Sequence, residues 1–191
     1  MTNIIKTETS FLDIHKLQNE NILVSCIEEI KDKLIINPPI FVFGKKAYQR
    51  RSVGFFSNTS VGYYYSNQIA KSIHLTPNLE KLLDIMNTKF NADFNGILIN
   101  KYNDGNDYIS AHSDDEKNLD IVGVVAISFG AIRTFRIRDK TTKKIITDIK
   151  TNPFEIIHMG GNFQKEFIHE IPIEKKVKDC RYSFTFRKHL V

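Results

Sequence analysis

The sequence predicts an α+β domain, a double-stranded β-helix (jelly roll) buttressed by N-terminal helices. Short segments rich in β-branched and aromatic residues follow one another from Gly96 onward. Turn sequences such as NDGND, DKTTK and MGGN separate them, and two amphipathic segments lie in the first half. Many short strands at this spacing predict a sandwich or barrel, and helices confined to one half predict a buttressed jelly roll.

Two helices are expected before residue 96. In residues 15–35, apolar residues recur at helical spacing with charges between them: Ile22, Cys26, Ile30 and Leu34. Residues 77–91 begin with a proline and carry an apolar stripe, which predicts a second amphipathic helix. We expect both helices to support a sheet and neither to carry chemistry.

The strands are expected in the second half of the chain, with additional hairpins before the second helix. The expected strands are residues 96–102, 121–129, 133–138, 143–149, 154–159, 167–171 and 181–187. Residues 38–66 are expected to form further β-hairpins joined by loops. We divide the chain into an N-terminal extension with a helix, residues 1–38, and a main domain, residues 39–191.

Composition is typical of a folded globular chain. Apolar residues make up 41% and charged residues 26%, which excludes a disordered chain, and no apolar run reaches the length of a membrane span. The first residues lack the pattern of a secretory signal.

Cys26 and Cys180 have apolar neighbours, so we expect two buried free thiols in a reducing compartment. We expect an intracellular monomer, located in the cytoplasm, the nucleus or a viral factory.

Three residues have the pattern of a metal site. His112 and Asp114 alternate along an extended segment, which sets their Cβ atoms about 7 Å apart on one side. This pair alone is common by chance, but His169 follows inside a short apolar strand, EFIHEIP. Two histidines and one carboxylate form the facial triad of non-haem Fe(II) oxygenases, which leaves three coordination positions open. Zinc is the alternative metal, although such zinc sites normally carry out hydrolysis.

The last predicted strand carries an arginine at each end. Alternation puts Arg181, Ser183, Thr185 and Arg187 on one face and the three aromatic residues on the other. The aromatic face belongs in the core, so the arginine face is expected to line the mouth of the barrel. Guanidinium forks bind carboxylates in a bidentate way, which suits a small dicarboxylate beside the metal.

These motifs together resemble the AlkB-type dioxygenases, which depend on Fe(II) and 2-oxoglutarate. The resemblance covers roughly residues 40–190. It rests on motifs that occur along the chain in the same order as in the family: NKYNDG followed by HSDDE, SFG and RTF, MGG with Gln164, HEIP, and the strand RYSFTFR. Two departures are Phe167, where many members carry Trp, and the turn NPFE at residues 152–155.

The resemblance implies a role for each matching residue. His112, Asp114 and His169 would ligate Fe(II), and Arg181 would bind the distal carboxylate of 2-oxoglutarate. Asn100, Tyr102 and Thr185 would line the cosubstrate pocket, and Arg187 would orient Asp114. The reaction would consume O2 and 2-oxoglutarate and oxidise an N-methyl carbon, which leaves as formaldehyde.

The segment of about residues 39–75 resembles the substrate-lid hairpins of the branch that repairs DNA. A methylated base must leave the duplex to be reached, so stacking aromatic residues and phosphate-binding cations are expected there. The expected substrate-binding residues are Phe43, which would fill the gap in the stack, Lys45 and Arg51 from the basic run of residues 45–51, Tyr63, Tyr65, Ser66, Asp115 and Glu116. Tyr65 and His112 are expected to hold the base between them.

Three interpretations of function stay open at this point. The first is an oxidative demethylase of 1-methyladenine and 3-methylcytosine in DNA or RNA. The second is a dioxygenase that acts on protein or lipid. The third is a noncatalytic nucleic-acid-binding module on the same scaffold. The net charge of +5 and the lid aromatics favour nucleic acid, and the intact triad argues against a noncatalytic module.

Overall fold

A computed structural model describes residues 1–42, 44–65, 68–114 and 122–189. The helices in this part of the chain are α1 (Asn21–Ile30), α2 (Pro77–Phe90) and α3 (Phe163–Glu166). The strands of the first half are β1 (Thr2–Lys6), β2 (Ser10–Lys16), β3 (Pro39–Val42), β4 (Lys45–Tyr48), β5 (Ser52–Phe56), β6 (Gly62–Tyr65) and β7 (Gln68–Ile73). Those of the second half are β8 (Gly96–Tyr102), β9 (Ile109–His112), β10 (Val124–Gly130), β11 (Thr134–Asp139), β12 (Ile145–Lys150), β13 (Glu155–Gly161), β14 (Phe167–Ile171) and β15 (Arg181–Arg187).

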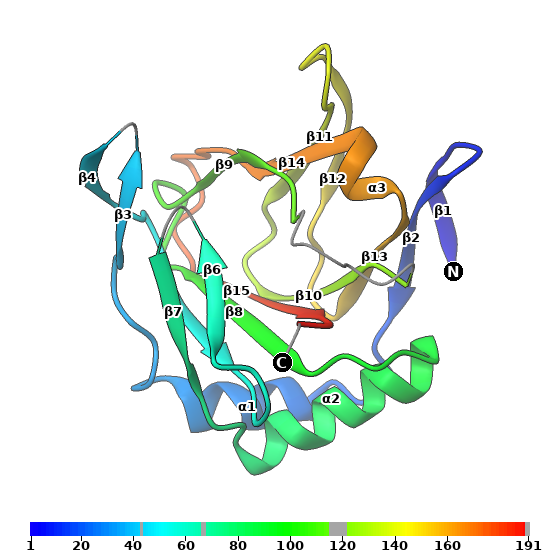
Figure 1. The fold of residues 1–191 in the computed structure, drawn as a ribbon. Coiled ribbons are helices and arrows are strands. Elements are labelled where there is room, and N and C mark those ends of the chain that lie inside the picture. Colours follow the sequence, from blue (N-terminus) through cyan, green and yellow to red (C-terminus); the bar gives the residue numbers. More distant parts are fainter. Residues whose placement is uncertain (43, 66–67, 115–121, 190–191) are drawn as a thin grey trace.

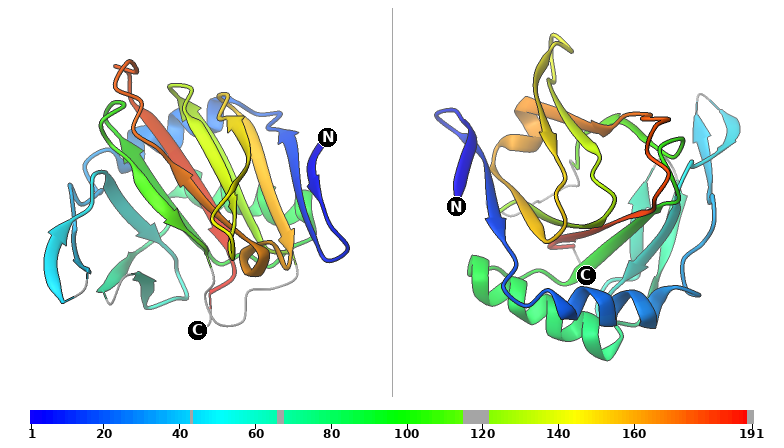
Figure 2. Two further views of the ribbon diagram at one scale, coloured as in Figure 1. Left: turned by 90° about the horizontal axis from the view of Figure 1, so that it is seen from above. Right: turned by 180° about the vertical axis from the view of Figure 1, so that it is seen from behind.

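Two facing sheets form the jelly roll that the sequence predicts (Figure 1). In the described chain, the larger sheet has the strand order β1-β2-β13-β10-β15-β8-β5-β7-β6. The smaller sheet has the order β12-β11-β14-β9, and β3 and β4 form a separate hairpin at the side of the molecule (Figures 1 and 2). Residues of both sheets line a cavity between them.

The two long helices cover the outer face of the larger sheet (Figures 1 and 2). Apolar residues of α1 and α2, such as Cys26, Leu82 and Met86, pack in one cluster with Phe184 and Phe186 of β15. Because strand residues alternate between faces, this packing turns the arginines of β15 toward the smaller sheet. The predicted supporting role of the helices and the predicted orientation of β15 are thus confirmed.

Strand pairing brings the predicted cosubstrate residues together. Within the larger sheet, β15 lies between β10 and β8. Arg181 pairs with Tyr102, and Ser183 pairs with Asn100 on one side and with Ser128 on the other. Residues far apart in sequence therefore line one patch of the inner surface.

The structure corrects three local predictions. The first helix begins at Asn21 and not at residue 15, because Ser10–Lys16 is a strand that pairs with β13. Strand β5 does not form a hairpin with its sequence neighbours but inserts between β8 and β7 of the larger sheet. Cys180 is exposed, whereas Cys26 is buried as expected, and both thiols are free.

Several elements begin and end where the sequence predicts. The second helix and the strands 96–102, 167–171 and 181–187 have the predicted bounds to within one residue. Among the described residues, no helix has both the length and the apolar character needed to cross a bilayer.

Candidate active site

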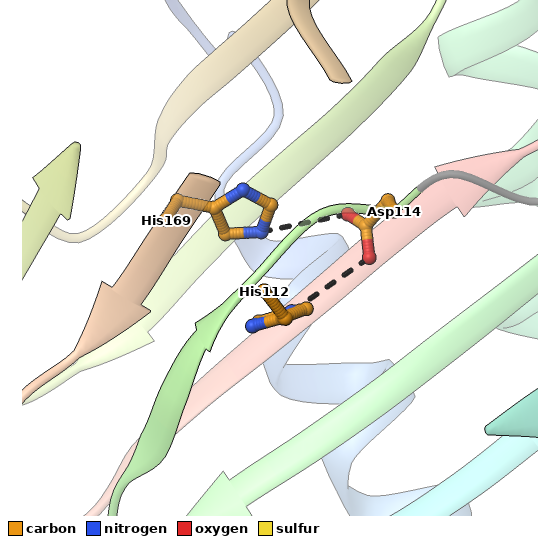
Figure 3. A group of neighbouring side chains, drawn as sticks. All are labelled: His112, Asp114 and His169. Atoms are coloured by element: carbon orange, nitrogen blue, oxygen red, sulfur yellow. Dashed lines mark ion pairs between the residues drawn. The ribbon is translucent and has the colours of Figure 1, made fainter. Parts of the chain in front are cut away.

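Two neighbouring strands and the turn after one of them form a cluster of possible metal ligands. His112 is the last residue of β9, and it pairs directly with His169 of the adjacent strand β14. This register sets the two imidazole centroids 4.5 Å apart. Asp114 follows two residues later and turns back toward both rings (Figure 3). One possible ligand atom from each residue lies within 4.8 Å of the others.

The Nε2 atoms of both histidines face the carboxylate. Nε2 of His112 lies 3.8 Å from Oδ1 of Asp114, and Nε2 of His169 lies 3.6 Å from Oδ2 (Figure 3). Nδ1 of His112 donates a hydrogen bond to the carbonyl oxygen of Ser110 over 2.8 Å. That donation puts the proton on Nδ1 and leaves the Nε2 lone pair for a metal. Two imidazoles and a carboxylate in this arrangement suit a divalent transition metal with open positions.

The charges of the cluster also suit a metal. Burial raises the pKa of Asp114, but Arg187 and the two histidines outweigh burial and hold it well below its usual range. The Nη2 atom of Arg187 donates to Oδ1 of Asp114 over 3.0 Å. Burial lowers the pKa of both histidines, that of His169 to about 3, and the positive charge of Arg187 acts in the same direction. The cluster is therefore an ionised carboxylate with two neutral imidazoles, the protonation state that binds metal.

A cavity between the two sheets extends from this cluster to Arg181. The wall residues belong to both sheets and include Asn100, Tyr102, Phe135, Met159, Ser183 and Thr185. Arg181 is 3% exposed, its Nε donates to Oγ1 of Thr151 over 3.2 Å, and its Nη2 donates to Oγ of Ser128 over 2.9 Å. The guanidinium carbon lies 5.3 Å from the ring centroid of Tyr102.

One donor of Arg181 has no acceptor among the described residues. Its Nη1 is buried and makes no hydrogen bond there. Burial lowers the pKa of Arg181 to about 10, so the side chain is still a cation near neutral pH. Burying a cation with an unpaired donor is energetically unfavourable unless an anion binds to it and accepts that hydrogen bond. The cavity thus fits a divalent metal at one end and a small carboxylate at the other.

The structure brings all the predicted metal and cosubstrate residues into this one cavity. All of them line it: His112, Asp114, His169, Asn100, Tyr102, Arg181, Thr185 and Arg187. The remaining histidines lie elsewhere. His15 and His158 pack with Phe90, His189 packs on Phe55, and His74 is exposed.

The predicted substrate residues are placed only in part. Lys45 is exposed on β4. Arg51 does not share the exposed basic surface expected for residues 45–51, because it is 5% exposed and lines the cavity, where it contacts Asn100. Phe43, Ser66, Asp115 and Glu116 lie outside the described residues, as do the side chains of Tyr63 and Tyr65.

Three supporting residues were not assigned a role from the sequence. Gln164 accepts a hydrogen bond from the backbone N–H of Asp114 over 2.9 Å and so fixes the turn that presents the carboxylate. Ser128 and Thr151 orient Arg181. Gln164 and Ser128 stand in segments that carried the family resemblance, whereas nothing in the sequence around Thr151 signals its contact.

Comparisons with known proteins agree with this geometry. Residues 13–187 match the model of the 2OG-Fe(II) oxygenase superfamily. The chain is 32% identical over 157 residues to the protein named DNA oxidative demethylase ALKBH2 of Bos taurus, and 30% identical over 158 residues to that of Homo sapiens. Each match covers 78% of this chain, which spans only 56% and 60% of those two proteins.

Two further similarities are to a relative matched over a shorter segment and to a solved structure. The alpha-ketoglutarate-dependent dioxygenase alkB homolog 3 of Rattus norvegicus is 32% identical over 123 residues, which are 60% of this chain and 42% of that protein. A solved structure titled "The structure of OsALKBH1" superposes with a TM-score of 0.66 over 98% of this chain and 100% of that chain. At 13% identity this last match supports the fold alone.

Proposed function

The chain belongs to the 2OG-Fe(II) oxygenase superfamily, and within it we propose an oxidative demethylase that repairs N-alkylated bases in nucleic acid, DNA above all. It is a 2-oxoglutarate-dependent dioxygenase that uses Fe(II), 2-oxoglutarate and O2, of the AlkB-like kind close to the DNA-repair demethylases. The observation that carries the proposal is the single cavity that joins His112, Asp114 and His169 to the unused donor of Arg181.

We assign the ligands by their donor chemistry. Nε2 of His112, Nε2 of His169 and the carboxylate of Asp114 would hold Fe(II). Arg181 would bind the distal carboxylate of 2-oxoglutarate, with Asn100 and Tyr102 on the adjacent wall. When bound, iron with 2-oxoglutarate and O2 supplies the oxidation of a methyl group on a base nitrogen, and the product loses formaldehyde.

The residues of the chain orient the metal ligands and exclude water from the site. Arg187 holds the carboxylate of Asp114 in place, and the hydrogen bond to Ser110 fixes the tautomer of His112. The apolar part of the wall excludes water from the reacting carbon: Leu98, Ile109, Ala126, Phe135, Ile157 and Ile171.

The exposure of His112 supports a base as substrate. The side chain of His112 is 19% exposed, whereas those of Asp114 and His169 are 6% and 7% exposed. A flipped base can therefore reach the imidazole of His112 without crossing the other two ligands. We propose Tyr65 as the opposite wall, and 1-methyladenine and 3-methylcytosine as substrates. Their methyl groups block pairing, which makes these bases cheap to flip.

The decisive experiment is a product analysis by mass spectrometry. The purified protein is incubated aerobically with Fe(II), 2-oxoglutarate and single-stranded or duplex oligonucleotides that each carry one methylated base. We expect loss of the methyl group together with one succinate and one formaldehyde per event, and none with the variant His169→Ala. Succinate without loss of any methyl group would contradict the nucleic-acid substrate and leave the dioxygenase itself intact.

A further inference from the structure

Two guanidinium groups pack against the ring of Tyr102 in the wall of the cavity. The guanidinium carbon of Arg133 lies 5.8 Å from the ring centroid, and that of Arg181 lies 5.3 Å from it. Tyr102 is 2% exposed and Arg133 is 1% exposed, so their contact is shielded from water. Because contacts between a cation and an aromatic ring are stronger when desolvated, Arg133 restrains the ring together with Arg181.

Four hydrogen bonds fix the guanidinium of Arg133. Its Nη1 donates to the carbonyl oxygen of Asp104 over 2.9 Å, and its Nε donates to Oε2 of Glu174 over 3.1 Å. Its Nη2 donates to the carbonyl oxygens of Asp107 and Pro172, over 2.9 Å and 2.7 Å. Every nitrogen of this guanidinium thus has an acceptor, and the group cannot turn without breaking buried hydrogen bonds.

We propose that Arg133 is a positioning residue for 2-oxoglutarate, because it holds the ring of Tyr102 in place beside Arg181. The described residues that line the cavity include Tyr102 and Arg181 but not Arg133, so Arg133 acts on the cosubstrate through these two side chains. The strand register supports this path, since Tyr102 of β8 pairs directly with Arg181 of β15. The inference rests on the proposed placement of the distal carboxylate of 2-oxoglutarate at Arg181.

Position, rather than charge, is what Arg133 contributes. Burial raises the pKa of Glu174, but hydrogen bonds from Thr134 and Arg133 outweigh burial and hold it below its usual range. Glu174 is therefore ionised near neutral pH, and at 3.1 Å its negative charge offsets that of Arg133. The substitution Arg133→Lys keeps the positive charge and removes the planar fork with its hydrogen bonds, so it tests position alone.

The test measures keto-acid binding by calorimetry at saturating Mn(II), so that metal affinity does not enter. We expect Arg133→Lys to raise the dissociation constant of 2-oxoglutarate roughly 5-fold, with an unchanged number of sites per chain. The keto acid 2-oxobutyrate lacks the distal carboxylate and should bind both proteins equally. Arg136→Lys is the matched control, because Arg136 of β11 pairs with Asp148 at 2.8 Å, outside the described wall of the cavity. It should leave both constants unchanged.

Two further variants test the path from Arg133 to the cosubstrate. In a Tyr102→Leu background, Arg133→Lys should cause no further loss of affinity for 2-oxoglutarate. Glu174→Ala leaves Arg133 in place and removes one of its four acceptors. It should also raise the dissociation constant of 2-oxoglutarate, although it makes the surroundings more positive. This variant decides the matter if Arg133→Lys does not fold.

Three outcomes would overturn the positioning role. The first is an unchanged dissociation constant, with or without fewer sites per chain, since Arg133 would then serve the fold alone. The second is an equal loss for 2-oxobutyrate, and the third is an additive loss in the Tyr102→Leu background. Failure of the proposed cosubstrate site is separate, because Arg181→Lys would then leave the affinity for 2-oxoglutarate unchanged.

Discussion

Inside the cavity, the Nε–H of Arg51 donates a hydrogen bond of 2.7 Å to Oδ1 of Asn100, and both side chains are buried. This contact fixes which way the amide of Asn100 faces, because the oxygen must point at the guanidinium. The oxygen of Asn100, a residue of the cavity wall, is thus engaged, and the amino group is the part of the amide that can still donate. Arg51 therefore determines that Asn100 offers a donor, which a carboxylate of 2-oxoglutarate can use.

Replacing Arg51 by methionine should weaken 2-oxoglutarate binding about tenfold, or ~1.4 kcal/mol. The amide of Asn100 would then be free to turn its oxygen toward the carboxylate. The measurement is an anaerobic titration of the Fe(II)-loaded protein with 2-oxoglutarate, followed by calorimetry.

A double-mutant cycle separates this role from direct contact. If Arg51 acts through Asn100, Arg51→Met should cost nothing further once Asn100→Ala is present. Additive losses of affinity would mean that Arg51 touches the cosubstrate itself, and the positioning role would be wrong.

Arg181→Lys should lower the affinity for 2-oxoglutarate and leave metal affinity unchanged. The hydrogen bonds to Thr151 and Ser128 hold the guanidinium so that Nη1 is the free donor, and an ammonium cannot reproduce that planar fork. We expect a loss of about 10-fold or more by the same titration. Binding of Mn(II) to each variant is the control, and an unchanged affinity for 2-oxoglutarate would exclude the assigned role.

The metal and cosubstrate residues could be predicted because their signals are local. His112 and Asp114 are separated by one residue, and His169 and the β15 arginines stand in short apolar strands whose alternation fixes their faces. The cavity could then be inferred once the aromatic face of β15 was assigned to the core. The register that pairs His112 with His169 depends on the folded sheet and could not be read from spacing.

The local predictions that the structure corrects concern strands whose pairing partners are distant in sequence. The helical pattern of residues 15–35 overlaps the end of the strand Ser10–Lys16, whose partner β13 is far away in sequence. Arg50 and Arg51 are adjacent and equally charged, yet Arg50 is exposed and Arg51 is buried in the cavity. Only the insertion of β5 beside β8, where Val53 pairs with Asn100, explains why the second arginine turns inward.

Acid should destabilise the protein partly through His158. Burial lowers the pKa of this residue by more than its contact with Val122 and the charge of Asp13 raise it. The unfolded chain takes up a proton near pH 6.5, and the folded chain does so only at lower pH. The contribution of His158 to the free energy of unfolding is therefore greatest above about pH 6.5, and it is lost as the pH falls below that value.

His158→Leu should reduce this pH dependence, by at most about 1.4 kcal/mol per pH unit. The measurement is urea unfolding in the presence of a chelator, near neutral pH and at about pH 5. His74→Leu, at an exposed position, is the matched control and should keep the full dependence. If the two variants lose stability equally on acidification, His158 is not a source of the effect.

Arg187→Met should destabilise the metal-free protein by about 3–5 kcal/mol, because it leaves the carboxylate of Asp114 buried without the guanidinium that holds it at 3.0 Å. Asp114 is ionised in the folded protein and 6% exposed, so the uncompensated charge is expensive. Urea unfolding in the presence of a chelator measures this cost.

In an Asp114→Asn background, the same change of Arg187 should cost less, since no buried carboxylate then loses its partner. Excess Mn(II) should restore more stability to Arg187→Met than to the unaltered protein, because the cation replaces the lost positive charge. Equal costs of Arg187→Met in both backgrounds would mean that Arg187 contributes packing and does not hold the metal-binding carboxylate.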